Sequence, residues 1–235
     1  MNIINSGIRG YIFDYGGTLD TGGCHWGRMI WHAYERKQVP IDESLFCEAY
    51  VYAERELGRN PIIQPDYTFR KTLSVKLRIE MEYIADKVSG FDAKRWHDDV
   101  LDDLYANTQR ETTHSRDVLL ALKKNWPMVL VSNFYGNIET VLGEFGLDGI
   151  FNSVVESAVV GIRKPDPRIF LLGVDALEMN PEEVVVVGDS YTKDIQPAKK
   201  VGCHTVWIKG EGWTSAEPDD QSAADKIIVN LDELL

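Results

Sequence analysis

Two uninterrupted apolar runs in the second half of the chain limit the folds that it can adopt, namely Pro127–Val131 and Val184–Val187. Continuous apolar runs of this kind are typical of parallel strands with helices on both faces, because neither face of such a strand meets water. Segments with helical spacing lie between and around the runs. Helices are expected at 116–124, 136–145, 167–177 and 192–201, and further strands at 204–208 and 226–229.

The first strand stands apart from the others. Ile8–Phe13 is a short apolar run that ends at Asp14-Tyr15-Gly16-Gly17, a glycine turn. From Cys24 to Arg110 the pattern changes to apolar residues at three- and four-residue spacing, with helices expected around 29–34 and at 44–57, 68–87 and 93–109. We therefore predict a Rossmann-like, doubly wound α/β core from 1–20 and 112–235, interrupted by an all-helical domain at 21–111.

Composition excludes several classes of protein. The chain of 235 residues has a formal net charge of -12 and a pI near 4.9, so broad attraction to nucleic acid or to an anionic membrane is not expected. The N-terminus carries no signal-like segment, and we expect a cytoplasmic protein that is a monomer or a weak homodimer. Three scattered cysteines predict neither a disulfide framework nor a thiolate zinc site.

Polar residues end the apolar runs or open the following loops. In an open parallel sheet, ligands bind beyond the carboxyl ends of the strands, so these residues form the candidate site. Each segment alone has an ordinary structural role as a turn, a helix cap or a proline-rich loop. Their joint occurrence in order indicates a phosphoryl-transfer site. The segments are Asp14-Tyr15-Gly16-Gly17-Thr18, Ser132-Asn133, Lys164-Pro165, and Gly188-Asp189-Ser190 with Asp194.

These four segments resemble the ordered motifs of the haloacid dehalogenase (HAD) superfamily, and the helical insertion occupies the place of that family's C1 cap. The resemblance implies that Asp14 attacks phosphorus to form an aspartyl-phosphate. It implies that Thr18 helps to hold the site, and that Ser132 and Lys164 bind the phosphoryl oxygens. The implied magnesium ligands are Asp14, the carbonyl of Gly16, Asp189 and Asp194. The expected substrate-binding residues are Gly17, Asn133, Arg59 and Arg70.

The chemistry of this site needs positive charge. A carboxylate can attack a dianionic phosphoryl group only when the negative charges are neutralised. A hard Mg²⁺ ion held by carboxylates and substrate oxygens does this. Lys164 would supply a second cation where charge spreads over the equatorial oxygens. The sequence therefore predicts a small phosphorylated molecule as substrate and Mg²⁺ as cofactor.

One position departs from the family pattern. Family phosphatases usually carry an aspartate two residues after the nucleophile, where it protonates the leaving group and then activates water. Here that position is Gly16. The loss of proton transfer costs typically about 10²–10⁴ in rate. We therefore expect a phosphate ester or anhydride hydrolase whose rate depends steeply on leaving-group pKa, unless Asp20 or a cap residue supplies a base.

Other functions remain open from sequence. A dehalogenase of the family also lacks the acid, but the second carboxylate at Gly188-Asp189 favours a cation site. A phosphonatase would use a cap lysine as a Schiff base, with Lys37, Lys71 and Lys76 available. A non-catalytic sensor would bind phosphate and magnesium without turnover. His25, next to Trp26, either enters the site or packs against the cap.

Overall fold

The computed structural model describes residues 7–213, 218 and 220–235. Within these residues the strands form one parallel sheet of six strands in the order β3-β2-β1-β4-β5-β6. The doubly wound α/β fold predicted from the sequence is confirmed. The strands are β1 (Gly10–Phe13), β2 (Met128–Ser132), β3 (Ser153–Glu156), β4 (Val184–Gly188), β5 (His204–Ile208) and β6 (Lys226–Ile228).

The edge strand β3 is absent from the sequence prediction. Its segment, Ser153-Val154-Val155-Glu156, has polar residues at both ends and is half-buried over its first two positions. A run with two apolar residues carries too little pattern to separate a strand from a loop. Pairing with β2, from Val129↔Ser153 to Ser132↔Glu156, is what makes this segment a strand.

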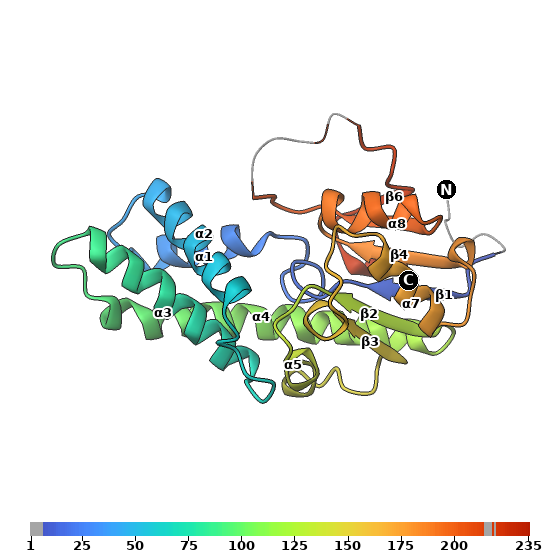
Figure 1. Cartoon of the computed structure of the whole chain (residues 1–235), viewed down its shortest axis with the longest axis horizontal. Coiled ribbons are helices and arrows are strands. Elements are labelled where there is room, and N and C mark those ends of the chain that lie inside the picture. The colour runs from blue at the N-terminus through green and yellow to red at the C-terminus, as the bar shows by residue number, and fades with distance from the viewer. Residues whose placement is uncertain (1–6, 214–217, 219) are drawn as a thin grey trace.

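Four helices form a lobe beside the sheet (Figure 1). They are α1 (Trp26–Lys37), α2 (Glu43–Arg59), α3 (Phe69–Lys87) and the first part of α4 (Ala93–Lys123). Side-chain caps fix all four of their starts: the side chains of His25, Asp42, Thr68 and Asp92 each accept a hydrogen bond from a backbone N–H in the first turn. Among the described residues, no helix combines the length and the apolarity that crossing a bilayer requires.

Helix α4 corrects the sequence prediction. Separate helices were expected at 93–109 and 116–124, but a single helix of 31 residues runs from Ala93 to Lys123. No glycine or proline interrupts this stretch. At a rise of about 1.5 Å per residue the helix spans about 46 Å, so it reaches from the cap lobe to the underside of the sheet (Figure 1). The boundary predicted at residues 111–112 therefore falls inside a helix.

The remaining helices cover the sheet. Alternate residues of the central strands point to opposite faces: Ile12 packs with α7 on one face, whereas Tyr11 and Phe13 pack on the other with α4. Burying both faces leaves the carboxyl ends of the strands as the place where polar side chains gather. These elements are α5 (Ile138–Glu144), α6 (Ser157–Val160), α7 (Arg168–Ala176), α8 (Gln196–Lys200), η1 (Pro181–Glu183), η2 (Tyr191–Ile195) and η3 (Leu231–Leu234).

Candidate active site

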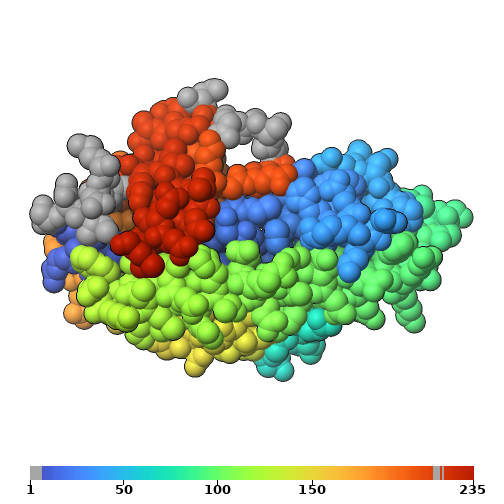
Figure 2. Space-filling view, turned by 180° about the vertical axis from the view of Figure 1, so that it is seen from behind, coloured from blue at the N-terminus to red at the C-terminus, as the bar shows by residue number. Residues whose placement is uncertain are grey.

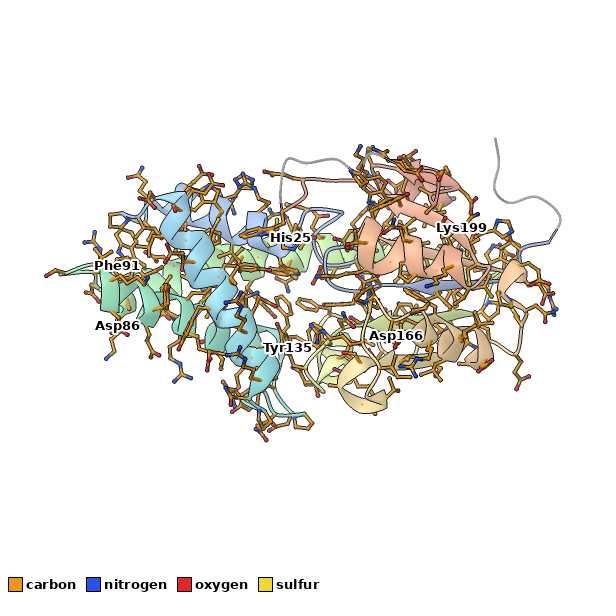
Figure 3. All side chains as sticks on the ribbon, turned by 45° about the horizontal axis from the view of Figure 1, so that its top comes forward. His25, Asp86, Phe91, Tyr135, Asp166 and Lys199 are labelled. Carbon is orange, nitrogen blue, oxygen red and sulfur yellow. The ribbon has the colours of Figure 1, made fainter. Side chains whose placement is uncertain are left out.

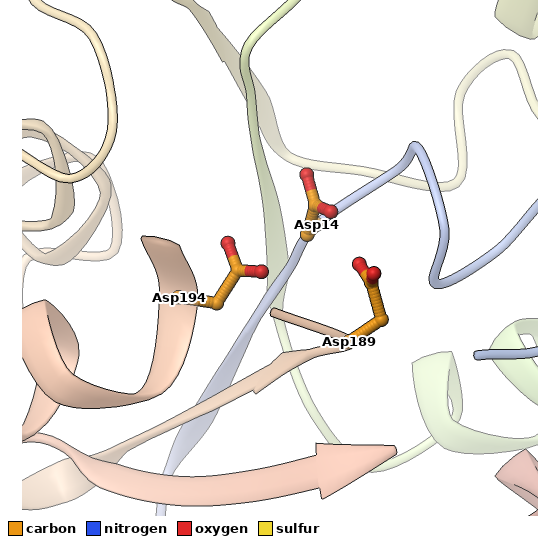
Figure 4. Close-up of side chains that lie close together, drawn as sticks. All are labelled: Asp14, Asp189 and Asp194. Carbon is orange, nitrogen blue, oxygen red and sulfur yellow. The ribbon is translucent and has the colours of Figure 1, made fainter. Parts of the chain in front are cut away.

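Three carboxylates from separate segments of the chain meet beyond the carboxyl ends of β1 and β4 (Figure 4). Asp14 follows β1, Asp189 follows β4, and Asp194 lies in η2. One oxygen from each lies within 4.8 Å of the others. Asp194 was predicted in an ordinary helix, but η2 is a π-helical turn, a form that is frequent at functional sites.

Lys164 lies between two of these carboxylates. Its Nζ donates to Oδ1 of Asp14 at 2.5 Å and to Oδ1 of Asp194 at 2.7 Å, and its side chain is 3% exposed. Burial lowers the pKa of Lys164, but the two carboxylates outweigh this and the net pKa is raised. The amine therefore stays charged at neutral pH.

Asn133 fixes the backbone of Lys164. Its Nδ2 donates to the Lys164 carbonyl at 3.0 Å, and its Oδ1 accepts from the Lys164 N–H at 2.9 Å. Asn133, which was predicted to bind substrate, lines the cavity, but both polar atoms of its side-chain amide already bond to the backbone of Lys164. Ser132, the last residue of β2, is buried and also lines the cavity.

Thr18 links the two central carboxylates. Its hydroxyl lies 3.4 Å from Oδ2 of Asp14 and 3.2 Å from Oδ1 of Asp189, and it accepts from the Asp189 N–H at 3.0 Å. Gly17 beside it has a positive φ of 97°, and a Cβ at this position would lie 2.5 Å from the Asp189 carboxylate. Only glycine therefore lets the loop after β1 approach the loop after β4.

The charges at this site are not balanced by protein groups alone. Burial and the neighbouring Asp194 and Asp14 raise the pKa of Asp189 well above its ordinary range. Among the described residues, none forms a direct ion pair with Asp189, because Lys164 is engaged with the other two carboxylates. Oxygen donors in this number and with this charge suit a divalent cation such as Mg²⁺. The residues present thus fit the metal that the sequence predicts.

Gly16 leaves space on the other side of Asp14. A Cβ at this position would lie 4.0 Å from the nearest atoms, which belong to the Trp26 ring, and Gly16 has no positive φ. The position lines the cavity, so a side chain there would face the substrate. Within the part of the chain that the structure describes, no carboxylate occupies this space.

Asp20 is held away from a simple proton-transfer role. It is fully buried, and its two oxygens accept from the Gly17 N–H at 2.7 Å and from Nε1 of Trp26 at 2.9 Å. Burial raises the pKa of Asp20 to about 7, while these hydrogen bonds lower it. Because both oxygens already hold protein donors, the arrangement suits positioning of the Gly17 turn and Trp26.

A cavity of about 500 Å³ opens between these residues and the cap. The cap contributes Tyr50 and Glu54 from α2, and Lys76 from α3. Glu54 and Lys76 form an ion pair, and the Lys76 ammonium lies 4.4 Å from the centre of the Tyr50 ring. The sequence offered Lys76 only as one of three cap lysines and gave no sign of Glu54.

Two predicted substrate-binding residues lie outside this cavity. Arg59 is the exposed last residue of α2, and Arg70 pairs with Asp102 on the surface. The loop between α2 and α3 docks on α5 instead of opening to the cavity. In that contact the Thr140 hydroxyl donates to the Pro65 carbonyl at 2.7 Å. The sequence shows a helix break here but not which way the loop faces.

His25 enters the cavity as a neutral donor. It caps α1, where its Nδ1 accepts from the Gly27 N–H at 3.0 Å, so the ring proton lies on Nε2. Burial and nearby lysines lower its pKa to about 4. Figure 3 places His25 and Tyr135 where the cap meets the core. The sequence left His25 open between a place in the site and a packing role, and this histidine lines the cavity and packs against the cap.

The loop after β5 joins the cap to the core. The His25 N–H donates to the Glu211 carbonyl at 2.8 Å, and the Glu211 carboxylate pairs with Arg28 and His32 of α1. Trp213 packs against His25 and lines the cavity. Figure 2 shows this segment reaching from the core to the cap. The sequence did not predict a role for this loop, because nothing local in it signals a ligand.

Comparison with known proteins accords with this geometry. Residues 8–202 match the family described as haloacid dehalogenase-like hydrolase. This chain belongs to the haloacid dehalogenase-like hydrolases. A glyceraldehyde 3-phosphate phosphatase of Pyrococcus furiosus is 31% identical over 208 residues, covering 85% of this chain and 79% of that protein.

Solved structures share the fold of this HAD-like hydrolase. A dehalogenase in an intermediate complex superposes with a TM-score of 0.65 at 20% identity, covering 97% of this chain and 96% of the other. A HAD hydrolase from Bacillus subtilis, bound to magnesium, superposes with a TM-score of 0.60 at 16% identity and covers 97% of each chain. At these identities the likeness concerns the fold alone.

The structure also separates the three cap lysines that a phosphonatase could use. Lys37 pairs with Asp103, and Lys71 lies over the Tyr67 ring, whereas Lys76 lines the cavity. Burial lowers the pKa of Lys76, but Glu54 and other nearby groups raise it well above its ordinary value. Schiff-base formation needs a neutral amine, and pairing with Glu54 favours the protonated form of Lys76, so the structure gives no support to the phosphonatase alternative.

A buried carboxyl in the cap gives a pH prediction. Burial raises the pKa of Glu80 to about 8, although Lys76 lowers it. Between pH 4.5 and 8 the unfolded chain ionises at this residue while the folded chain stays protonated, so stability falls as pH rises. Glu80→Gln should match wild type at pH 4 and be more stable by roughly 3–5 kcal/mol at pH 9. Urea unfolding at both pH values measures this.

The matched control is Glu82→Gln, which removes an exposed carboxylate from the same helix. It should show no pH-dependent gain. Equal stability of wild type and Glu80→Gln at pH 9 would mean that Glu80 is hydrated or paired when ionised.

Proposed function

We propose that this protein is a magnesium-dependent hydrolase of small phosphate esters or anhydrides that acts through an aspartyl-phosphate on Asp14. The observation that carries the proposal is that Asp14, which lines a cavity, is paired with Lys164 and lies beside two further carboxylates. The phosphatase named among its relatives supports the same reaction class. Each feature alone is common, but together they supply a nucleophile and charge neutralisation in one place.

The residues of the chain divide the reaction between them. An oxygen of Asp14 attacks phosphorus while the bond from phosphorus to the leaving-group oxygen breaks, and water later releases phosphate and restores Asp14. Lys164, held by Asn133, would balance charge on the phosphoryl oxygens. The Thr18 hydroxyl, through its hydrogen bonds to both carboxylates, fixes the position of Asp14 relative to Asp189. Bound magnesium, held by Asp14, Asp189 and Asp194, would supply further positive charge at the phosphoryl group.

The glycine at position 16 sets the substrate preference. The leaving group departs without a proton donor at that position, so the rate of the first step should fall steeply as leaving-group pKa rises. We expect aryl and acyl phosphates to react at least about 10²-fold faster than alkyl phosphates of similar size. Steady-state kcat/KM for a series of aryl and alkyl phosphates, with magnesium, measures this dependence.

The series also tests other groups for proton transfer. Equal rates across it would contradict the proposal and indicate that another residue of the cavity donates the proton. A phosphoenzyme trapped by acid quench and located at Asp14 by mass spectrometry would distinguish the hydrolase from a sensor that binds phosphate without turnover. Chloride release from haloacids would point instead to a dehalogenase.

A further inference from the structure

Glu54 shares the cavity with three cations: Lys76, with which it forms an ion pair, and Arg163 and Lys193, which line the same cavity. The Glu54 side chain is 34% exposed, lines the cavity and pairs with Lys76. Burial alone would raise the pKa of Glu54, but Lys76, Lys193 and Arg163 lower it below its ordinary value. Arg163 comes from the loop before α7 and Lys193 from η2, both in the core, whereas Lys76 comes from the cap. In this group of side chains the three cations outnumber the single carboxylate of Glu54.

Arg163 and Lys193 have no ion-pair partner of their own among the described residues. Lys76, by contrast, is buried, bound to Glu54 and stacked over Tyr50. Lys164 is already paired with Asp14, the proposed nucleophile, and with Asp194. Arg163 and Lys193 are thus two cations that line the cavity without an ion-pair partner among the described residues. Lys209 also lines the cavity and lies over the Trp207 ring.

We propose that the leaving group of the substrate carries a carboxylate, which Arg163 and Lys193 bind beside the Lys76–Glu54 pair. The inference rests on the proposed hydrolase function and names the substrate class. Glu54 shows that a carboxylate fits among these cations. Arginine favours this ligand because its planar guanidinium binds a carboxylate through two parallel hydrogen bonds. The substrate class is then a small phosphorylated carboxylic acid.

Glu54 also affects how strongly these cations bind a substrate carboxylate. It competes with the substrate carboxylate for the same cations and repels it at short range. When no substrate is bound, the negative charge of Glu54 partly neutralises these cations. A neutral amide at this position keeps the hydrogen bond to Lys76 and removes the competition. Glu54→Gln should therefore strengthen binding of the acidic substrate, whereas Arg163→Gln should weaken it.

The test compares two phosphate esters that differ in one group: phosphoglycolate, which carries the carboxylate, and 2-hydroxyethyl phosphate, which carries a hydroxyl. Both have alkyl leaving groups, so the absent acid at Gly16 affects both. In the wild type, kcat/KM should favour phosphoglycolate by about tenfold or more, since charge-assisted hydrogen bonds contribute on this scale. The preference should fall to about twofold in Arg163→Gln and rise in Glu54→Gln.

The matched control is Arg59→Gln, which removes the same charge from the exposed end of α2. This variant should leave kcat/KM for both esters, and the ratio of the two values, unchanged. An equal preference in the wild type, or a loss in Arg163→Gln that is the same for both esters, would overturn the proposal. The second outcome would place Arg163 on the transferring phosphoryl group.

Binding separates this proposal from the proposed function. Trp26 and Trp213 line the cavity, so their fluorescence can report the dissociation constants of both esters with magnesium present. If no ester is hydrolysed but phosphoglycolate still binds about tenfold more tightly, the hydrolase function fails and the carboxylate site stands. If hydrolysis proceeds and the two esters bind alike, the carboxylate site fails and the hydrolase stands.

Discussion

Asp14→Asn is expected to abolish phosphate release, with a loss of at least about 10³-fold in kcat and no trapped phosphoenzyme. The amide is a poor nucleophile, and its neighbours Lys164 and Thr18 offer no replacement. Removing one negative charge also relieves the repulsion that raises the pKa of Asp189 and Asp194. The variant should therefore fold, and in the absence of metal its Tm should equal or exceed that of the wild type.

Metal dependence provides the second readout for this variant. Magnesium should raise the Tm of the wild type, because the cation binds the folded cluster alone. The increase should be smaller in Asp14→Asn, which has lost one ligand. Asp148→Asn removes an exposed carboxylate from the core and should behave as wild type in every assay. Residual turnover in Asp14→Asn near the wild-type rate would exclude Asp14 as the nucleophile.

Gly16→Asp is expected to speed hydrolysis of alkyl phosphates by about 10² or more, because it supplies the proton donor and base that the chain lacks. The structure makes room for it: the nearest atoms to a Cβ lie at 4.0 Å, in the Trp26 ring. Aryl phosphates, whose leaving groups need little protonation, should gain far less. Rates for a paired alkyl and aryl ester measure the difference.

Gly16→Asn is the matched control for this change. It has nearly the same size and polarity but cannot transfer a proton, so it should leave the alkyl-to-aryl ratio as in the wild type. A similar gain in both variants would show that the side chain acts by filling space. No gain in either would show that another cavity residue already transfers the proton.

The sequence determined the core and the nucleophile end of the site, because the information there is local. Each central strand is a short apolar run that ends at its polar motif, and parallel strands bring those ends to one edge. This pattern was enough to predict that Asp14 and Asp189 lie together, whereas Lys164, in a loop before a helix, was expected there only from the resemblance to the family motifs. Thr18 and the glycine at position 17 follow from the same loop.

Tertiary structure decided the leaving-group end, because no local pattern records how the cap packs on the core. Glu54 and Lys76 belong to different helices, and only packing of α2 on α3 brings them to the cavity beside Arg163. The same packing turned Arg59 away from the site. The strand β3 likewise depends on its neighbour rather than on its own residues. The spacing of apolar residues thus specifies the helices and strands and where they end. Contacts between helices and strands that are distant in sequence specify which ligand the cavity can bind.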